Sequence, residues 1–101
     1  MMRVLLVDDH AVVRMGFRML LEGSGIEVAG EAGDGEQACQ EVARLKPDVV
    51  VLDLSMPGMG GLEALRRMLA QQPRLRVLVL SAHEDTAHPS RALRAGALGY
   101  L

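Results

Sequence analysis

Short apolar segments alternate with amphipathic segments along the chain. Strands are predicted where valine and leucine cluster, at residues 3–7, 26–32, 48–53 and 76–81 and from residue 97 onward. Between them, apolar residues recur at steps of three and four, which predicts helices near residues 12–21, 35–45, 61–72 and 90–95. In the first helix we expect Arg14 and Arg18, one turn apart, on the outer face.

Strands that alternate with helices predict right-handed crossovers and a doubly wound parallel sheet. Residues 49–52 and 77–80 are continuous apolar runs, which is typical of strands covered on both faces. Asp34 is the expected N-cap of the second helix, and Gln37, three residues later, completes a capping-box pattern.

Acidic and hydroxyl side chains follow three of the predicted strands directly. Asp8 and Asp9 come after the first strand, Asp53 ends the third, and Ser81 ends the fourth. Sites in open parallel sheets form beyond the carboxyl ends of the strands, so we expect these side chains to share one crevice. Carboxylates at such short distances repel one another unless a cation binds or a proton is taken up. We therefore predict a site for a hard divalent metal ion.

Composition narrows the class of protein. The chain has 101 residues, enough for one domain, and its net charge of −2 with one Tyr and one Phe argues against nucleic-acid binding by this segment. Cys39 is the only cysteine, so no internal disulfide forms, and a structural thiol is expected. The sequence contains no apolar stretch of the roughly 20 residues that span a bilayer, and no signal peptide is evident. We therefore expect a cytoplasmic protein without membrane partners.

Asp53 is the candidate reacting group. A carboxylate can attack an activated phosphoryl group and form an aspartyl phosphate. Mg²⁺ suits this chemistry because it takes oxygen ligands and is commonly held by one or two carboxylates together with phosphate oxygens. The hydroxyl of Ser81 can then bond the new phosphoryl group.

Several of these residues also have plainer interpretations. Asp8 can serve as the N-cap of the first helix, Ser81 can simply begin a loop, and Tyr100 can be a half-buried aromatic at the sheet edge. A zinc site of His10, His83 and an aspartate is conceivable, but the spacing matches no recognised zinc motif.

Four motifs resemble the receiver domain of two-component response regulators, and their details resemble the NarL/FixJ type. The motifs are Val7-Asp8-Asp9-His10, Asp53-Leu54-Ser55-Met56-Pro57-Gly58-Met59-Gly60-Gly61, Leu80-Ser81-Ala82-His83-Glu84-Asp85 and Arg94-Ala95-Gly96-Ala97-Leu98-Gly99-Tyr100-Leu101.

The resemblance implies a role for each matching position. Asp53 would be the phosphoacceptor, Ser81 the switch hydroxyl, and Tyr100 the aromatic residue that turns inward with it. Asp9 and Asp53 would bind Mg²⁺ directly together with the backbone carbonyl of Ser55, and Asp8 would act mostly through a metal-bound water. The implied partners are a sensor histidine kinase, a second copy in a homodimer, and DNA only through a separate output domain.

The resemblance also implies a flavodoxin-like, five-stranded sheet in the order 2-1-3-4-5. Residues 1–101 would form one receiver domain that is incomplete at its C-terminus, with the last strand cut short, the final helix missing and no output domain in this chain. The family places a lysine three residues after the switch aromatic; the only lysine here is Lys46, which precedes Pro47.

The leading hypothesis is thus a signalling switch that accepts a phosphoryl group, rather than an enzyme that turns over a substrate. One alternative is an interaction module on the same fold that works without phosphorylation. The absence of the family's lysine from residues 1–101 favours it. A second alternative is a metal-dependent phosphohydrolase that uses Asp53. It is weaker, because such enzymes generally need a second acid near the nucleophile and residue 55 is a serine.

Overall fold

A computed structural model of the chain describes residues 1–54, 56, 60–80 and 99–100, the last pair as backbone. Its sheet is parallel, with the order β2-β1-β3-β4-β5. The strands are β1 (Arg3–Val7), β2 (Glu27–Ala32), β3 (Val49–Asp53), β4 (Arg76–Leu80) and β5 (Gly99–Tyr100). The helices within the described residues are α1 (Ala11–Gly23), α2 (Gly35–Leu45) and α3 (Gly61–Gln71).

The predicted fold class and strand order are confirmed. The bounds of the first four strands and of α2 and α3 agree with the sequence expectation to within one residue, and α1 is somewhat longer at both ends. The helix expected at residues 90–95 lies outside the described residues.

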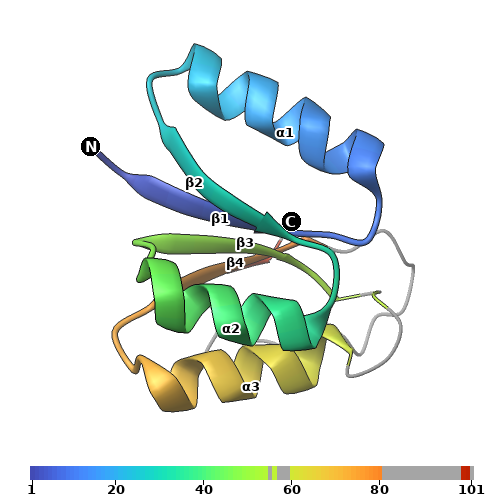
Figure 1. Ribbon diagram of the computed structural model, residues 1–101, viewed down its shortest axis with the longest axis vertical. Helices are drawn as coiled ribbons and strands as arrows, with labels where there is room; N and C mark the ends of the chain where they lie inside the picture. The colour runs from blue at the N-terminus through green and yellow to red at the C-terminus, as the bar shows by residue number, and fades with distance from the viewer. Residues whose placement is uncertain (55, 57–59, 81–98, 101) are drawn as a thin grey trace.

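Helices cover the two faces of the sheet unequally (Figure 1). α2 and α3 lie side by side on one face, and α1 lies on the other. Strand residues alternate between these faces. Those toward α2 and α3 form the larger core with apolar residues of both helices: Leu5, Val7, Val50, Leu52, Val77, Val79, Ala38, Val42, Ala64, Leu65 and Met68. The smaller core on the α1 face contains Val4, Leu6, Val28 and Val51, against which Phe17 and Leu21 pack.

The expectation that residues 77–80 are covered on both faces holds only for one face. Val77 and Val79 are fully buried beneath the α3 side, whereas Leu78 and Leu80 are only half-buried. Among the described helices, α1 is the one on that face, and it lies over β1 and β2 rather than over β4.

The expected orientation of α1 was wrong. Arg14 and Arg18 do not lie on the outer face; both turn toward β2 and bond Glu31. The exposed residues of α1 include Glu22 and several large apolar ones: Val12, Val13, Met15, Met19 and Leu20. Because α1 carries two apolar stripes, periodicity alone did not reveal which side faces the sheet.

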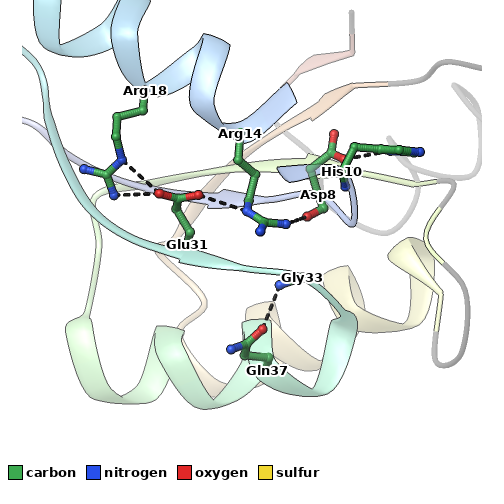
Figure 2. A network of polar contacts seen from close by, with 7 residues as sticks. All are labelled: Asp8, His10, Arg14, Arg18, Glu31, Gly33 and Gln37. Carbon is green, nitrogen blue, oxygen red and sulfur yellow. Dashed lines mark hydrogen bonds and ion pairs between the residues drawn. The ribbon is translucent and has the colours of Figure 1, made fainter. Parts of the chain in front are cut away.

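The N-terminus of α2 confirms the predicted cap and modifies the capping box. The Asp34 carboxylate accepts a hydrogen bond of 2.8 Å from the Gln37 backbone N–H. The Gln37 side chain reaches back one residue further than expected and accepts from the Gly33 backbone N–H at 2.7 Å (Figure 2). The turn between β2 and α2 is therefore held from both sides.

None of the helices in the described part of the chain has the length and apolar character that crossing a membrane requires.

Candidate metal centre at the carboxyl edge of the sheet

The acidic residues reach one edge because β1 and β3 are neighbouring parallel strands. Asp53 is the last residue of β3 and pairs with Leu80 of β4. Asp8 follows β1 directly, and its backbone N–H donates to the carbonyl of Ala32 at 3.0 Å, which continues the pairing with β2 by one residue. The strands β1 and β3 therefore end at the same edge of the sheet, as expected for a site beyond the carboxyl ends of the strands.

Asp8, Asp9, His10 and Asp53 form one cluster of possible metal ligands. Each offers one ligand atom, and these atoms all lie within 4.8 Å of one another. Two ligands on opposite sides of a Mg²⁺ ion lie about 4 Å apart, so the cluster has the dimensions that a common ion requires. Asp8 and Asp53 are buried, and Asp9 and His10 are exposed, so one side of the cluster opens to solvent.

His10 joins the cluster through its side chain. Its Nδ1 lies 3.1 Å from Asp8 Oδ1 and 3.0 Å from Asp9 Oδ1. An ionised carboxylate only accepts hydrogen bonds, so a hydrogen bond between His10 and Asp8 requires the tautomer that carries a proton on Nδ1. The sequence analysis considered His10 only as a ligand of a conceivable zinc site; His83, the other histidine of that site, lies outside the described residues.

Asp8 is not the N-cap of α1. The N-cap is His10, whose side chain makes no capping bond. Asp8 instead accepts a 2.7 Å hydrogen bond from the His10 backbone N–H, so its carboxylate orders the turn that leads into the helix. The plainer interpretation of Asp8 is thus replaced by a turn-forming role that leaves its second oxygen available for other contacts.

Arg14 connects this turn to β2 (Figure 2). Its Nη1 donates to the backbone carbonyl of Asp8, and its Nε donates to Glu31 at 2.9 Å. Burial raises the pKa of Glu31, but hydrogen bonds from Arg18 and Arg14 lower that pKa by more, so the carboxylate stays ionised at neutral pH. Nothing in the sequence pattern indicated these two contacts of Arg14, because both partners lie outside α1.

Gly61 brings the start of α3 against the end of β3. A Cβ atom at this position would lie 2.4 Å from the Cα of Leu54 and 2.7 Å from the carbonyl oxygen of Asp53. Only glycine allows this approach without displacing backbone. Gly61 therefore contributes to the position of Asp53 although it offers no ligand.

The remaining predicted site residues are described only in part. Ser55 and Ser81 lie outside the described residues, and Tyr100 is described as backbone in β5. Lys46 is the C-cap of α2, in a left-handed conformation, just before β3 begins. It therefore lies at the opposite edge of the sheet from Asp53.

The donor set fits the ion that the sequence predicts. Asp8, Asp9 and Asp53 supply carboxylate oxygens, the ligand type that Mg²⁺ prefers. Two of these carboxylates are buried, which makes their mutual repulsion more costly and the binding of a cation more favourable.

Comparison with known proteins identifies the same type of domain. Residues 4–101 match the family model of the response regulator receiver domain. The chain is 47% identical over 102 aligned residues to the response regulator GacA of Pseudomonas viridiflava, covering all of this chain and 48% of GacA. It thus spans about half the length of the curated relatives it matches.

Solved structures agree. The signal receiver domain of the putative response regulator NarL from Mycobacterium tuberculosis is 40% identical, with a TM-score of 0.92 over 99% of this chain and 82% of that one. A CheX–CheY complex with BeF3 and Mg²⁺ from Borrelia burgdorferi is 26% identical, with a TM-score of 0.94 over 99% of this chain and 76% of that one. Receiver domains bind Mg²⁺ at an acidic pocket, and the cluster around Asp53 lies at the carboxyl edge of the same fold. This chain belongs to the receiver domains of two-component response regulators, of the NarL/FixJ type.

Proposed function

We propose that this domain is a signalling switch in which Asp53 accepts a phosphoryl group from a phosphohistidine of a sensor kinase. The observation that carries the proposal is the convergence of Asp8, Asp9 and Asp53, whose ligand atoms lie within 4.8 Å of one another beside a solvent-open side. A module that only docks other proteins would not need three mutually repelling carboxylates at one edge.

The transfer itself needs little from the protein besides positioning. A carboxylate oxygen of Asp53 forms a bond to phosphorus while the bond from phosphorus to the histidine nitrogen breaks, and the released imidazole takes up a proton. Asp53 is buried at the end of β3, so its carboxylate is held on a rigid strand while Asp9 remains exposed beside it.

Asp9, Asp53 and the backbone carbonyl of Ser55 would hold Mg²⁺, with Asp8 acting mostly through a bound water. When bound, the ion neutralises charge on the phosphoryl oxygens. The Borrelia CheY complex, which contains BeF3 and Mg²⁺, supports this assignment by fold and by 26% identity.

The switch follows from the modified Asp53. Ser81 would bond the phosphoryl group, and Tyr100 would turn inward with it, so the acyl phosphate favours one arrangement of the segment after β4. The chain spans 48% of the length of the response regulator GacA. In a longer protein of that kind the change would be passed on through homodimer formation and an output domain that binds DNA. The domain would then be a switch that at most catalyses its own phosphorylation and dephosphorylation.

Adduct formation on Asp53 tests the proposal. The chain is incubated with Mg²⁺ and either beryllofluoride or a small phosphodonor, and Asp53 is followed by NMR and mass spectrometry. We expect a stable adduct on Asp53 that requires Mg²⁺ and is lost in Asp53→Asn. Asp34→Asn is the matched control, because asparagine also caps helices well and Asp34 is not one of the four residues of the cluster.

Three other outcomes contradict the proposal. Label that persists in Asp53→Asn places the acceptor elsewhere. No adduct with any donor favours an interaction module that works without phosphorylation. Rapid, repeated turnover of the donor favours a phosphohydrolase.

A further inference from the structure

We propose that Arg14 is a positioning residue for the metal centre: its guanidinium, held by Glu31 of β2, fixes the Asp8 carbonyl and thereby the approach of the Asp8 and Asp9 carboxylates. The inference rests on the proposed function, since it assumes that Mg²⁺ binds at this cluster.

Arg14 contacts the turn after β1 directly. Its Nη1 donates to the carbonyl oxygen of Asp8, and its Nε donates to Glu31 Oε1 at 2.9 Å. Its side chain is only 20% exposed although it lies on α1, which has no buried residue. A guanidinium has donors in a planar fork and can bind a carboxylate and a carbonyl at once.

Glu31 is itself held in place from the other side. Arg18 donates to its second oxygen through Nε at 2.9 Å and lies within 2.8 Å through Nη2. Glu31 therefore lies between two arginines on successive turns of α1 (Figure 2). Only Arg14 of this pair also reaches Asp8, so the network has one end at the cluster and one end away from it.

The contact matters because the other contacts described for Asp8 involve its backbone N–H and its carboxylate, whereas Arg14 binds its carbonyl. Its backbone N–H donates to Ala32, and its Oδ1 accepts from the His10 N–H. The carbonyl that Arg14 binds belongs to the peptide between Asp8 and Asp9. Rotation of that peptide would move the Asp9 side chain, and Mg²⁺ demands near-ideal ligand geometry. Groups that orient metal ligands typically change metal affinity by about 10–100-fold when they are removed.

Charge alone predicts the opposite effect. A positive guanidinium near the cluster repels a divalent cation, so removing its charge would strengthen Mg²⁺ binding if positioning were unimportant. The two contributions therefore differ in sign, and variants that keep or remove the charge separate them.

The test is the affinity for Mg²⁺ of the full chain, measured by calorimetric titration, with Arg14→Lys as the main variant. Lysine keeps the charge but lacks the fork that bridges Glu31 and Asp8. We expect the dissociation constant for Mg²⁺ to rise about tenfold. Arg18→Lys is the matched control: it disturbs the same carboxylate from the next turn, does not contact Asp8, and is expected to leave the affinity unchanged.

Two further measurements exclude a general loss of structure. In EDTA, the melting temperatures of Arg14→Lys and Arg18→Lys should fall by similar amounts. At saturating Mg²⁺, Arg14→Lys should again form the beryllofluoride adduct on Asp53. Arg14→Gln is a second variant, in which positioning predicts weaker binding and charge alone predicts tighter binding.

The outcomes separate this inference from the proposed function. Wild-type chain that neither binds Mg²⁺ nor forms the adduct contradicts the proposed function itself. If the wild-type chain binds Mg²⁺, three results overturn the role of Arg14 alone. They are an unchanged dissociation constant in Arg14→Lys, an equal rise of that constant in Arg18→Lys, and tighter binding by Arg14→Gln.

Discussion

At the scale of single residues, the surroundings of Asp53 depend on a neighbour without a side chain. Gly61 begins α3, and any Cβ there would overlap the backbone of Leu54 and the carbonyl of Asp53. Backbone atoms cannot yield as the end of a flexible side chain can. The close approach therefore couples the first turn of α3 to the residue that would be phosphorylated.

Gly61→Ala should accordingly destabilise the fold and weaken Mg²⁺ binding together. We expect the free energy of unfolding to fall by about 1–3 kcal/mol, the usual cost of overpacking. Gly16→Ala is the control within α1, because a Cβ there meets no atom within 4 Å, and removing a glycine from a helix interior stabilises by about 0.5–1 kcal/mol. Urea denaturation of both variants checks the difference; equal changes would contradict the steric argument.

At the scale of elements, α1 and α3 are attached to the sheet in different ways. α3 buries Ala64, Leu65 and Met68 in the larger core. α1 has no fully buried residue; Phe17 and Leu21 pack half-buried against the smaller core, and Arg14 and Arg18 form ion pairs with Glu31 of β2. Packed apolar side chains contribute more to stability than partly exposed ion pairs, so α3 should contribute more than α1.

Equivalent truncations in the two helices test this contrast. Leu65 of α3 is 0% exposed and Leu20 of α1 is 70% exposed. We expect Leu65→Ala to lower the free energy of unfolding by about 2–5 kcal/mol and Leu20→Ala to change it by no more than about 0.5 kcal/mol. Denaturant titrations provide the comparison, and a large loss from Leu20→Ala would indicate that the exposed stripe of α1 is covered in solution.

At the scale of the whole molecule, the fold holds like charges together at the edge where the strands end. Asp8 and Asp53 are both buried there, with Asp9 beside them. The folded state therefore carries a repulsion that the unfolded chain avoids, and a bound cation removes it. Sites of this kind commonly reduce stability in exchange for function.

Asp53→Asn should therefore have opposite effects with and without metal. In EDTA we expect the variant to be more stable than wild type by about 0.5–2 kcal/mol. With Mg²⁺ at a hundred times its dissociation constant, wild type should gain about 2.7 kcal/mol, and the variant should gain clearly less. Thermal unfolding in both buffers measures this; a variant that is less stable in EDTA and responds normally to Mg²⁺ would contradict the account.

The fold and the ligand cluster were largely predictable from local pattern. Alternating strands and helices imply parallel pairing, and parallel pairing brings the ends of β1 and β3 together. Asp8, Asp9 and Asp53 directly follow or end these strands, so their convergence needed no knowledge of individual side-chain contacts. The N-cap at Asp34 was likewise predictable, because capping depends on residues three apart.

The orientation of α1 and the contacts that it makes could not be predicted from local pattern. α1 has two apolar stripes, and the choice between them depends on Glu31, a residue of β2 that comes thirteen positions after Arg18. Glu31 also binds Arg14, whose guanidinium reaches the Asp8 carbonyl. The turn before α1 brings the His10 ring to the carboxylates of Asp8 and Asp9. Which residues reach the edge of the sheet follows from the sequence alone, since the order of the elements and the period of a strand are local properties. Their orientation there required partners from a different strand, which become neighbours only when the sheet and α1 pack together.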